Sequence, residues 1–463
     1  MNVAREKYDA IILGFGKGGK TLAADFADRG WKVAMVERSA DMYGGTCINI
    51  GCIPTKALVH LSEISEYRRP STCSEQAEEY RKAIAKKNEI TSFLRKKNFD
   101  NLDSRSLVTV YTGTASFLSP TQIQIKAGNE TKEIESKRIF INTGSSTVIP
   151  DIPGVNSSKR VYTSTTLMEL DILPEHLVIV GGGYIGLEFA SMYAGFGSKV
   201  TVLETASRLI PREDEDIARA VRDALEKKGV AFHTDVSVRT IEDKETETLV
   251  TYFNNRDESL VNLPADAVLL ATGRKPNTEG LNLEAVGVKL TQRGAVEVDD
   301  HLHSSVAGIW AMGDVKGGLQ FTFISLDDSR IIKDELFGRG ERNMSDRDPV
   351  AYSVFIDPPL SRIGLSEEDA IQGGWKIKVA KLPAAAIPRA RTLGKTEGLL
   401  KLIVDAETDL ILGCTLFCAD SSEVINIVAL SMRSGQSYTF LRDAIFTHPS
   451  MSEALNDLFS LIK

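Results

Sequence analysis

The stretch YDAIILGFGKGG, residues 8–19, decides the fold of this chain. Its apolar run stops at a glycine, as a buried parallel strand does, and a G-x-G-x-x-G pattern follows. A helical pattern over residues 20–28 comes next, and then a second apolar run, residues 31–36, that ends at Glu37. This order predicts a dinucleotide-binding βαβ unit. The glycines of the pattern are Gly14, Gly16 and Gly19.

The same unit recurs later in the chain. Residues 177–180 form an apolar run that leads into GGGYIG, residues 181–186, and a helical pattern over residues 187–194. A second strand pattern, residues 199–203, ends at Glu204. Two such units predict two dinucleotide sites in one polypeptide, with the second site built on Gly181, Gly183 and Gly186.

An acidic residue ends the second strand of each unit, where a carboxylate can accept hydrogen bonds from ribose hydroxyls. A 2′-phosphate beside Glu204 would meet like charge, and Thr205 rather than an arginine follows directly. This favours NADH over NADPH at the second site. Arg208 lies close enough in the sequence to keep NADPH as the alternative.

The segment GGTCINIGCIPTK, residues 44–56, holds two cysteines five positions apart. On a regular helix their Cα atoms would lie about 8.7 Å apart, whereas a disulfide needs less than ~7 Å. A bridge between Cys47 and Cys52 therefore requires a break in the helix, which Gly51 and Pro54 permit. A zinc site would need two further ligands at suitable spacing. We interpret the pair as a reversible dithiol, which in a reducing compartment is catalytic rather than structural.

Composition excludes several other classes of protein. The 463 residues are 42% apolar and 25% charged, which is typical of a soluble globular protein of about three domains. With 55 basic and 63 acidic residues the net charge is −8, and nothing indicates a nucleic-acid partner. We find no apolar run long enough to span a membrane and no secretory signal, and five cysteines do not make a disulfide scaffold. We therefore expect a cytoplasmic location.

Further motifs follow in a fixed order. A long charged helix is expected over residues 80–99, and short strands are expected over residues 108–140. Three signatures and a turn-rich joint at residues 150–154 come after them. The signatures are NTG at residues 142–144, ATGRKPN at residues 271–277 and GIWAMGD at residues 308–314, and the chain nears its end with FTHPSMSE at residues 446–453.

In this order the motifs resemble the class I pyridine nucleotide-disulfide oxidoreductases, the family of glutathione reductase, dihydrolipoamide dehydrogenase and mercuric reductase. The resemblance covers essentially the whole chain. It implies a glutathione-reductase-like α/β fold with two Rossmann-like domains, an α+β C-terminal dimerisation domain and a homodimer. The implied division is an FAD-binding domain at 1–152, an NAD(P)-binding domain at 153–273, a central segment completing the FAD site at 274–345, and a dimerisation domain at 346–463.

The resemblance also implies which residues hold each cofactor. Glu37 would hold the adenosine half of FAD, Asp314 would hold its ribitol, and Tyr184 would gate the nicotinamide pocket. The full FAD set is Gly14, Gly16, Gly19, Glu37, Thr46, Thr143, Gly144, Gly313 and Asp314. The NAD(P) set is Gly181, Gly183, Tyr184, Gly186, Glu204 and Gly273.

Catalytic roles follow from the same resemblance. Cys52 would lie nearer the isoalloxazine ring and form a thiolate–flavin charge-transfer pair, and Cys47 would be the interchange thiol that attacks the substrate. Lys56 would lie near flavin N5 and pair with Glu188, where a cation stabilises the reduced, anionic flavin.

The C-terminal motif supplies an acid–base pair in this family. His448 and Glu453 match it, and they would act on the partner subunit's Cys47. Histidine titrates near neutral pH, so it can accept a proton from a thiol and return it to a leaving group.

Finer features narrow the substrate. They resemble the bacterial flavoproteins of reactive-chlorine resistance, which implies a small oxidant such as hypothiocyanous acid or related reactive chlorine species, with copper(II) as another acceptor. Dihydrolipoamide dehydrogenase is the alternative. A mercuric reductase is less favoured, since that enzyme generally lacks a histidine at the position of His448. A non-catalytic flavin-binding regulatory protein is also less favoured, since it would need neither the two thiols nor His448. The features are GLQFT at 318–322, SLDD at 325–328, IPRAR at 387–391 and NDLFSL at 456–461.

The remaining candidates carry no predicted chemistry. Cys414 and Cys418 lie in an apolar run and are expected in a core. His301 and His303 could share one strand face, but no third metal ligand lies near them, and we predict no metal site. Residues 212–216 are predicted to be a solvated helix start.

Overall fold

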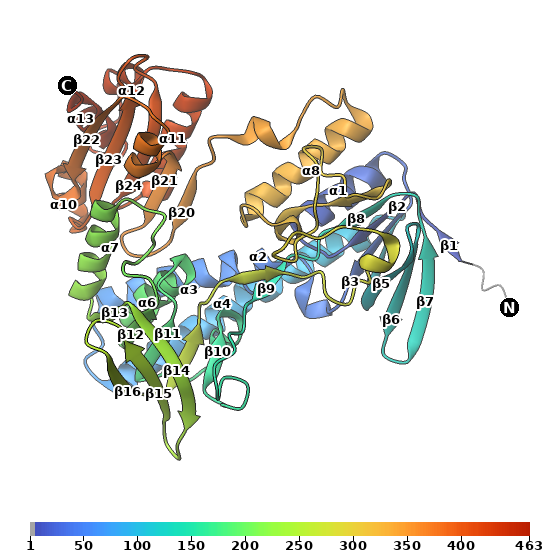
Figure 1. The fold of residues 1–463 in the computed structure, drawn as a ribbon, viewed down its shortest axis with the longest axis horizontal. Coiled ribbons are helices and arrows are strands. Elements are labelled where there is room, and N and C mark those ends of the chain that lie inside the picture. The colour runs from blue at the N-terminus through green and yellow to red at the C-terminus, as the bar shows by residue number, and fades with distance from the viewer. Residues whose placement is uncertain (1–4) are drawn as a thin grey trace. The chain divides into compact units, whose positions relative to one another are not determined.

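The computed structural model describes residues 5–463 and divides them into two compact units (Figure 1). Unit 1 contains the chain up to Ala57 together with Ile84–Val148 and Gly273–Arg347. Unit 2 contains Leu58–Ala83, Ile149–Thr272 and Asp348–Lys463. The segment that follows Thr272 therefore packs with the first βαβ unit and not with the second.

A five-stranded parallel sheet forms the centre of unit 1. Its strand order is β19 (Ile309–Ala311), β8 (Ile139–Ile141), β2 (Ala10–Leu13), β3 (Val33–Glu37) and β4 (Val108–Thr112). All its neighbours pair in parallel. This sheet contains the predicted strands of the first βαβ unit.

Alternate residues of β2 feed two separate cores, because successive side chains of a strand point to opposite faces. Ala10 and Ile12 pack with the helices α1 (Lys17–Asp28) and α8 (Thr322–Phe337), which lie side by side in Figure 1. Ile11 and Leu13 pack toward the other face. That face meets a mixed sheet in the order β1 (Glu6–Lys7), β7 (Glu130–Glu135), β6 (Gln122–Ala127) and β5 (Thr114–Ser119), in which only β1 and β7 pair in parallel.

Helix α1 starts three residues earlier than its sequence pattern predicts, since two glycines lie inside it. A Cβ atom at Gly18 would be 2.5 Å from the carbonyl oxygen of Ser325 on α8, and one at Gly19 would be 2.6 Å from that of Gly14. Both positions need glycine so that the helix can pack closely. The helical pattern therefore becomes visible in the sequence only after them.

Unit 2 repeats the parallel arrangement. Its first sheet has the order β10 (Val161–Thr163), β17 (Ala267–Leu270), β11 (His176–Val180), β12 (Lys199–Glu204) and β13 (Val230–Thr234). The helix α6 (Tyr184–Phe196) connects β11 to β12, as the second predicted βαβ unit requires, and α7 (Glu215–Lys227) precedes β13. An antiparallel sheet adjoins them, made of β14 (Val236–Asp243), β15 (Thr248–Asn254) and β16 (Ser259–Ala265).

The C-terminal part of unit 2 is an α+β arrangement. Its antiparallel sheet has the order β20 (Tyr352–Val354), β21 (Leu360–Gly364), β24 (Ile411–Phe417), β23 (Leu399–Asp405) and β22 (Ile377–Pro383). The helices of this part include α11 (Ser421–Arg433), α12 (Tyr438–Arg442) and α13 (Ala454–Ser460). Together with the two parallel sheets, this arrangement confirms the predicted fold class. Cys414 and Cys418 are buried in the core of this part, as predicted.

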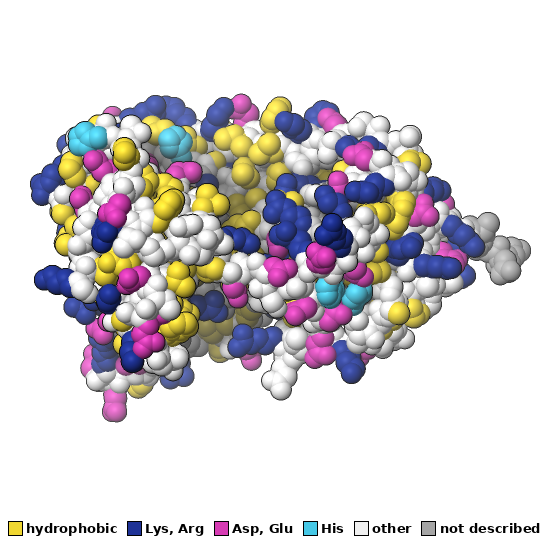
Figure 2. Space-filling view, turned by 90° about the horizontal axis from the view of Figure 1, so that it is seen from above, with side chains coloured by type: hydrophobic (Ala, Val, Ile, Leu, Met, Phe, Trp, Pro, Cys, Tyr) yellow, Lys and Arg dark blue, Asp and Glu magenta, His cyan; other side chains and the backbone are white. Residues whose placement is uncertain are grey.

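The remaining elements connect these layers. Two short strands, β9 (Ser145–Thr147) and β18 (Arg274–Pro276), pair antiparallel in unit 1. The predicted charged helix is longer than expected, since α4 spans Cys73–Asp103. Two further helices, α2 (Thr46–Asn49) and α3 (Cys52–Arg68), carry the cysteine pair. None of the helices formed by residues 5–463 combines the length and apolar character of a membrane span. Acidic and basic side chains are intermixed on the face drawn in Figure 2.

Candidate functional site

The two neighbouring cysteines lie on either side of a helix break. Cys47 is in α2 and Cys52 begins α3, and the helical path is interrupted at Gly51, as a bridge between the two requires. Pro54, also expected to permit the break, instead lies in the first turn of α3, where its missing N–H leaves no helical bond unmade. Both cysteines are free thiols that hydrogen-bond with each other.

The surroundings of the pair favour a thiolate on one of its members. The pKa of Cys52 is lowered to about 6 by its hydrogen bond with Cys47, by the Thr322 hydroxyl and by the charge of Lys56, against the raising effect of burial. The same hydrogen bond and burial raise the pKa of Cys47. These surroundings therefore favour Cys52 as the thiolate and Cys47 as the thiol.

Thr322 is a contact that sequence reasoning missed. Its Oγ1 lies 3.3 Å from Cys52 Sγ, and it is the first residue of α8. The first N–H groups of a helix carry partial positive charge, which stabilises a nearby anion. The motif at residues 318–322 contained this threonine, but its position relative to the cysteines depends on the fold.

The first glycine turn is held by side chains from distant parts of the sheet. Glu37 Oε2 accepts a hydrogen bond from Phe15 N at 2.9 Å, and burial raises the pKa of this carboxyl. Asn142 Oδ1 accepts one from Gly19 N at 2.9 Å, while its Nδ2 donates to the Met312 carbonyl at 2.9 Å. Asn142 therefore joins the predicted NTG and GD signatures to the glycine turn, a role that we had not assigned to it.

The signatures assigned to FAD meet in unit 1. Ser145 donates to Asp314 Oδ2 at 2.7 Å, and Arg274 Nε donates to the Ser145 hydroxyl at 2.8 Å. Thr143 Oγ1 donates to the Asn277 carbonyl at 2.7 Å. Three segments far apart in the sequence therefore come together in unit 1, and their binding of FAD stays a prediction. Gly273 and Gly313 lie in this unit as well, whereas the sequence predicts Gly273 to belong to the NAD(P) set.

The second glycine turn is closed by its own acidic residue. Glu204 Oε2 accepts from Gly182 N at 2.6 Å, and Oε1 accepts from Ala206 N at 2.7 Å. Arg208, the residue that kept NADPH as the alternative cofactor, donates to both carboxylate oxygens of Glu368 at 3.1 Å. Its guanidinium is therefore already paired.

Two further predicted site residues, Tyr184 and Glu188, lie in α6. Tyr184 is its first residue, and its hydroxyl donates to Glu213 Oε1 at 2.7 Å. Glu188 is buried and accepts a hydrogen bond from Phe355 N at 2.8 Å. Lys56 belongs to unit 1 and Glu188 to unit 2, so their pairing stays a prediction.

The predicted acid–base pair is assembled in the C-terminal part of unit 2. Glu453 lies 2.8 Å from Nδ1 of the exposed His448 and is the N-cap of α13. A carboxylate on Nδ1 orients the ring and keeps a proton on that nitrogen, which leaves Nε2 for proton transfer.

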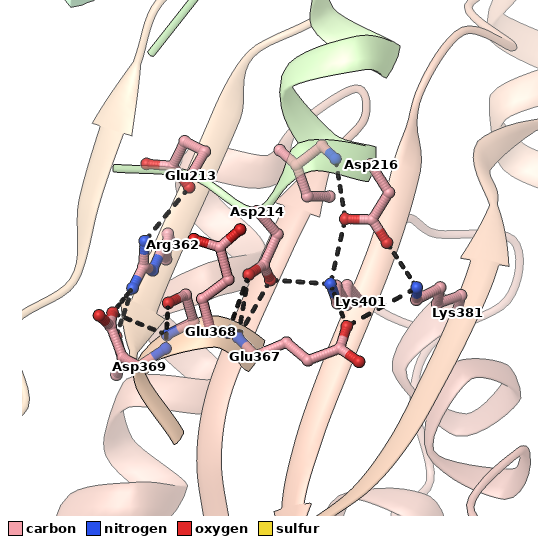
Figure 3. Close-up of polar contacts among 12 residues, drawn as sticks. Glu213, Asp214, Asp216, Arg362, Glu367, Glu368, Asp369, Lys381 and Lys401 are labelled. Carbon is pink, nitrogen blue, oxygen red and sulfur yellow. Dashed lines mark hydrogen bonds and ion pairs between the residues drawn. The ribbon is translucent and has the colours of Figure 1, made fainter. Parts of the chain in front are cut away.

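Residues 212–216 do start a helix, since Asp214 is the N-cap of α7, and Arg212 and Glu215 are exposed as predicted. The prediction of a solvated segment was wrong for Glu213 and Asp214, which are buried. Glu213, Asp214 and Asp216 belong to an ion-pair cluster with side chains of the C-terminal part of unit 2 (Figure 3). Lys401, which is 2% exposed, lies 2.8 Å from Asp214, 2.6 Å from Glu367 and 3.0 Å from Asp216. Local sequence could not indicate this burial, because the buried lysine comes from β23.

Both ring nitrogens of His303 lie beside carboxylates. His303 Nδ1 lies 3.1 Å from Asp299 Oδ2, and Nε2 lies 2.7 Å from Glu335 Oε1. Within residues 5–463, no group of three or more potential ligands is arranged to hold a metal ion.

Comparisons with known proteins agree with this geometry. The family model described as pyridine nucleotide-disulphide oxidoreductase matches residues 8–328, and the model of that family's dimerisation domain matches residues 350–459. The chain is 51% identical over 457 residues to the probable pyridine nucleotide-disulfide oxidoreductase RclA of Escherichia coli K12, covering 99% of this chain and 100% of the relative.

More distant relatives are also similar over most of their length. Identity is 33% to a mercuric reductase of Staphylococcus aureus (97% of this chain, 81% of the relative) and 32% to a dihydrolipoyl dehydrogenase of Geobacillus stearothermophilus (96% and 94%). Among solved structures, the Cu(II) complex of the HOCl-induced flavoprotein disulfide reductase RclA from Escherichia coli superposes with a TM-score of 0.92 at 50% identity, covering 99% of this chain and 100% of that one.

Proposed function

Because the chain belongs to the pyridine nucleotide-disulphide oxidoreductase family and is an enzyme close to the flavoprotein disulfide reductase RclA, we propose that it passes electrons from NADH through FAD to Cys47 and Cys52 and on to a small oxidant. The family implies FAD and NAD(P)H as cofactors, and the dimerisation domain supports a homodimer. FAD, when bound, would supply the two-electron chemistry that links the nicotinamide to the cysteine pair.

The glycine turns fit dinucleotides. A Cβ at Gly183 would meet no atom within 4 Å, and the φ of this residue, −79°, suits any amino acid. Packing within the protein therefore does not require glycine at this position. The open space beside the helix N-terminus is instead suited to a pyrophosphate. Gly16 and Gly183 are both N-caps without a side-chain hydrogen bond, which leaves backbone N–H groups for phosphate oxygens. These features support the proposed FAD and NADH sites.

The cysteine pair does the chemistry at the substrate end. We assign the attack on the oxidant to Cys47: its sulfur bonds to the electrophilic sulfur of hypothiocyanous acid and hydroxide leaves, which takes up the thiol proton as water. The Cys52 thiolate then attacks Cys47, forms the disulfide and releases thiocyanate, so the oxidant gains two electrons. Because its pKa is raised, Cys47 needs a base, and the partner subunit's His448 suits that role.

NADH is the proposed donor. Glu204 ends β12 where the ribose of a dinucleotide binds in such units, and its negative charge disfavours a 2′-phosphate. The salt bridge of Arg208 with Glu368 removes the nearest candidate for binding that phosphate. Oxidation rates with NADH and NADPH, compared as kcat/KM, test this preference.

We also propose the division of the chain into FAD, NAD(P), central and dimerisation segments at 1–152, 153–273, 274–345 and 346–463. A cytoplasmic location is proposed with it, since a catalytic dithiol needs a reducing compartment.

The observation that carries the proposed function is the pair of free thiols on either side of the helix break, with the Thr322 hydroxyl at the start of α8 lying 3.3 Å from Cys52 Sγ. It is tested by steady-state oxidation of NADH with hypothiocyanous acid, copper(II), lipoamide, glutathione disulfide and mercury(II) as acceptors. We expect hypothiocyanous acid to give the highest kcat/KM and Cys47→Ser to abolish that turnover. Dominant turnover of lipoamide would overturn the proposal in favour of a dihydrolipoamide dehydrogenase.

A further inference from the structure

A single carboxylate holds two tyrosine hydroxyls in unit 2. Glu213 is 2% exposed, and its Oε1 accepts from Tyr184 at 2.7 Å and from Tyr352 at 2.5 Å. The two hydroxyls are 3.2 Å apart, and the ring centroids are 5.7 Å apart. Burial and the charge of Glu213 raise the pKa of both phenols, so both remain donors at neutral pH.

The position of this carboxylate is set by the C-terminal sheet. Arg362, on β21, donates to the Arg212 carbonyl at 2.6 Å, and its Nη1 lies 3.6 Å from Glu213 Oε2. On the other side of Glu213, Asp214 is held by Lys401 of β23. Figure 3 shows Arg362 next to Glu213 and Lys401 next to Asp214. A buried carboxylate is costly unless paired, so this segment is fixed at three successive residues.

No step of the proposed reaction uses Glu213, yet its main contact is the residue assigned to gate the nicotinamide. All the partners of this tether lie in unit 2, which also carries the second glycine turn. The Tyr184 phenol, when bonded to Glu213, is therefore fixed in one orientation by residues of unit 2. A phenol without the tether samples other rotamers, and in the gating role assigned to Tyr184 those rotamers would close the nicotinamide pocket.

We propose that Glu213 is a positioning residue for NADH, which keeps the Tyr184 gate open and couples it to the dimerisation part through Tyr352 and Arg362. The inference rests on the proposed role of Tyr184. It deepens the proposed function, since it names the group that determines how readily the nicotinamide enters. Glu213 touches neither the cofactor nor the substrate in this scheme and acts only through the tyrosine.

Glu213→Gln tests the tether, since the amide keeps the size of the side chain and loses its charge. The apparent affinity for a ligand falls with the fraction of protein that is competent to bind it, so we expect the Kd for NAD⁺ and the KM for NADH to rise about tenfold, with kcat changed less than about twofold. Glu215→Gln is the matched control. Glu215 is exposed, pairs with Arg219 at 3.0 Å and loses the same charge two positions away.

A mutant cycle separates positioning from a general structural effect. The Kd for NAD⁺ is measured by calorimetry on the FAD-loaded protein for the wild type, Glu213→Gln, Tyr184→Phe and the double variant. If Glu213 acts through Tyr184, the double variant binds NAD⁺ about as weakly as Tyr184→Phe alone. Additive losses, or an unchanged Kd in Glu213→Gln, would overturn the tether.

Tyr352→Phe covers the case in which Glu213→Gln does not fold. It leaves the charge of Glu213 paired with Arg362 and removes only the second hydroxyl, and we expect a rise of about threefold in the Kd for NAD⁺. No rise in this variant would also overturn the tether. A wild-type protein that binds NAD⁺ but passes no electrons from NADH to any acceptor would overturn the proposed function and leave the tether standing.

Discussion

Replacing Thr322 with valine should move the pKa of Cys52 upward. The valine keeps the branched shape but cannot donate to a thiolate, and the lost hydrogen bond is 3.3 Å long. At that length, a hydrogen bond to a charged group is worth about 1.4 kcal/mol, which is about one pKa unit. Cys52 would therefore titrate near 7 instead of at about 6.

The sign of the effect follows from the thiolate, which is the reactive form of cysteine. With a pKa of about 6, Cys52 is half thiolate at pH 6. After the substitution only about a tenth would be thiolate at that pH, so the alkylation rate should fall about fivefold, while above pH 9 the rates should converge. The lowered pKa thus gives reactivity that is present above the shifted value and is lost as the pH falls through it.

The assay is iodoacetamide alkylation of the reduced protein without oxygen, with Cys52 and Cys47 resolved by fragment-ion mass spectrometry. Thr322→Ser is the control, since its hydroxyl can make the same bond, and its curve should follow the wild type. A Thr322→Val curve that superimposes on the wild type, or a Thr322→Ser curve that shifts as far as valine, would refute the reasoning.

Three further substitutions test other parts of the account. Lys401→Met leaves Asp214 unpaired in the interior and should lower the free energy of unfolding by about 3–5 kcal/mol in urea titrations, and a loss below 1 kcal/mol would contradict a paired cluster. Asn142→Ala removes the acceptor of Gly19 N, and we expect about 1–3 kcal/mol lower stability and weaker retention of FAD in gel filtration, with unchanged retention as the opposing result. His448→Gln should slow NADH oxidation by the natural oxidant about 100-fold or more, as loss of general acid–base catalysis does, without changing FAD content; equal rates would remove His448 from the mechanism.

The parts of the molecule that could be predicted from sequence are those with a local pattern. Each glycine turn stands next to its strand, its helix and its acidic residue, so a window of about 30 residues contains the whole unit. The cysteine pair is local too, and the need for a break near Gly51 followed from helix geometry alone. The contact between Thr322 and Cys52 could not be predicted in this way, because α8 lies far from the cysteines in the sequence and only the fold brings the two residues together.

The segment at residues 212–216 shows why a local pattern can also mislead. Charged residues before a helix are usually solvated, and Glu215 is indeed exposed. Asp214 is buried because Lys401 supplies the opposite charge from another strand, and no periodicity in either segment indicates that pairing. Pairings between distant charged residues are therefore the part of a fold that a single sequence conceals most completely.

The two acidic residues at the strand ends illustrate how one local motif serves two purposes. Glu37 and Glu204 were assigned to ribose hydroxyls, yet each already accepts a hydrogen bond from the backbone of its own glycine turn, at Phe15 and Gly182 respectively. A carboxylate has about four acceptor positions, so a bond to the turn does not prevent a bond to a ligand. Because the turn is held by the protein itself, binding a dinucleotide does not have to order it, which lowers the entropic cost of association. The acidic residue thus stabilises the turn in addition to the ribose contact predicted for it, and we expect glutamine at either position to weaken both.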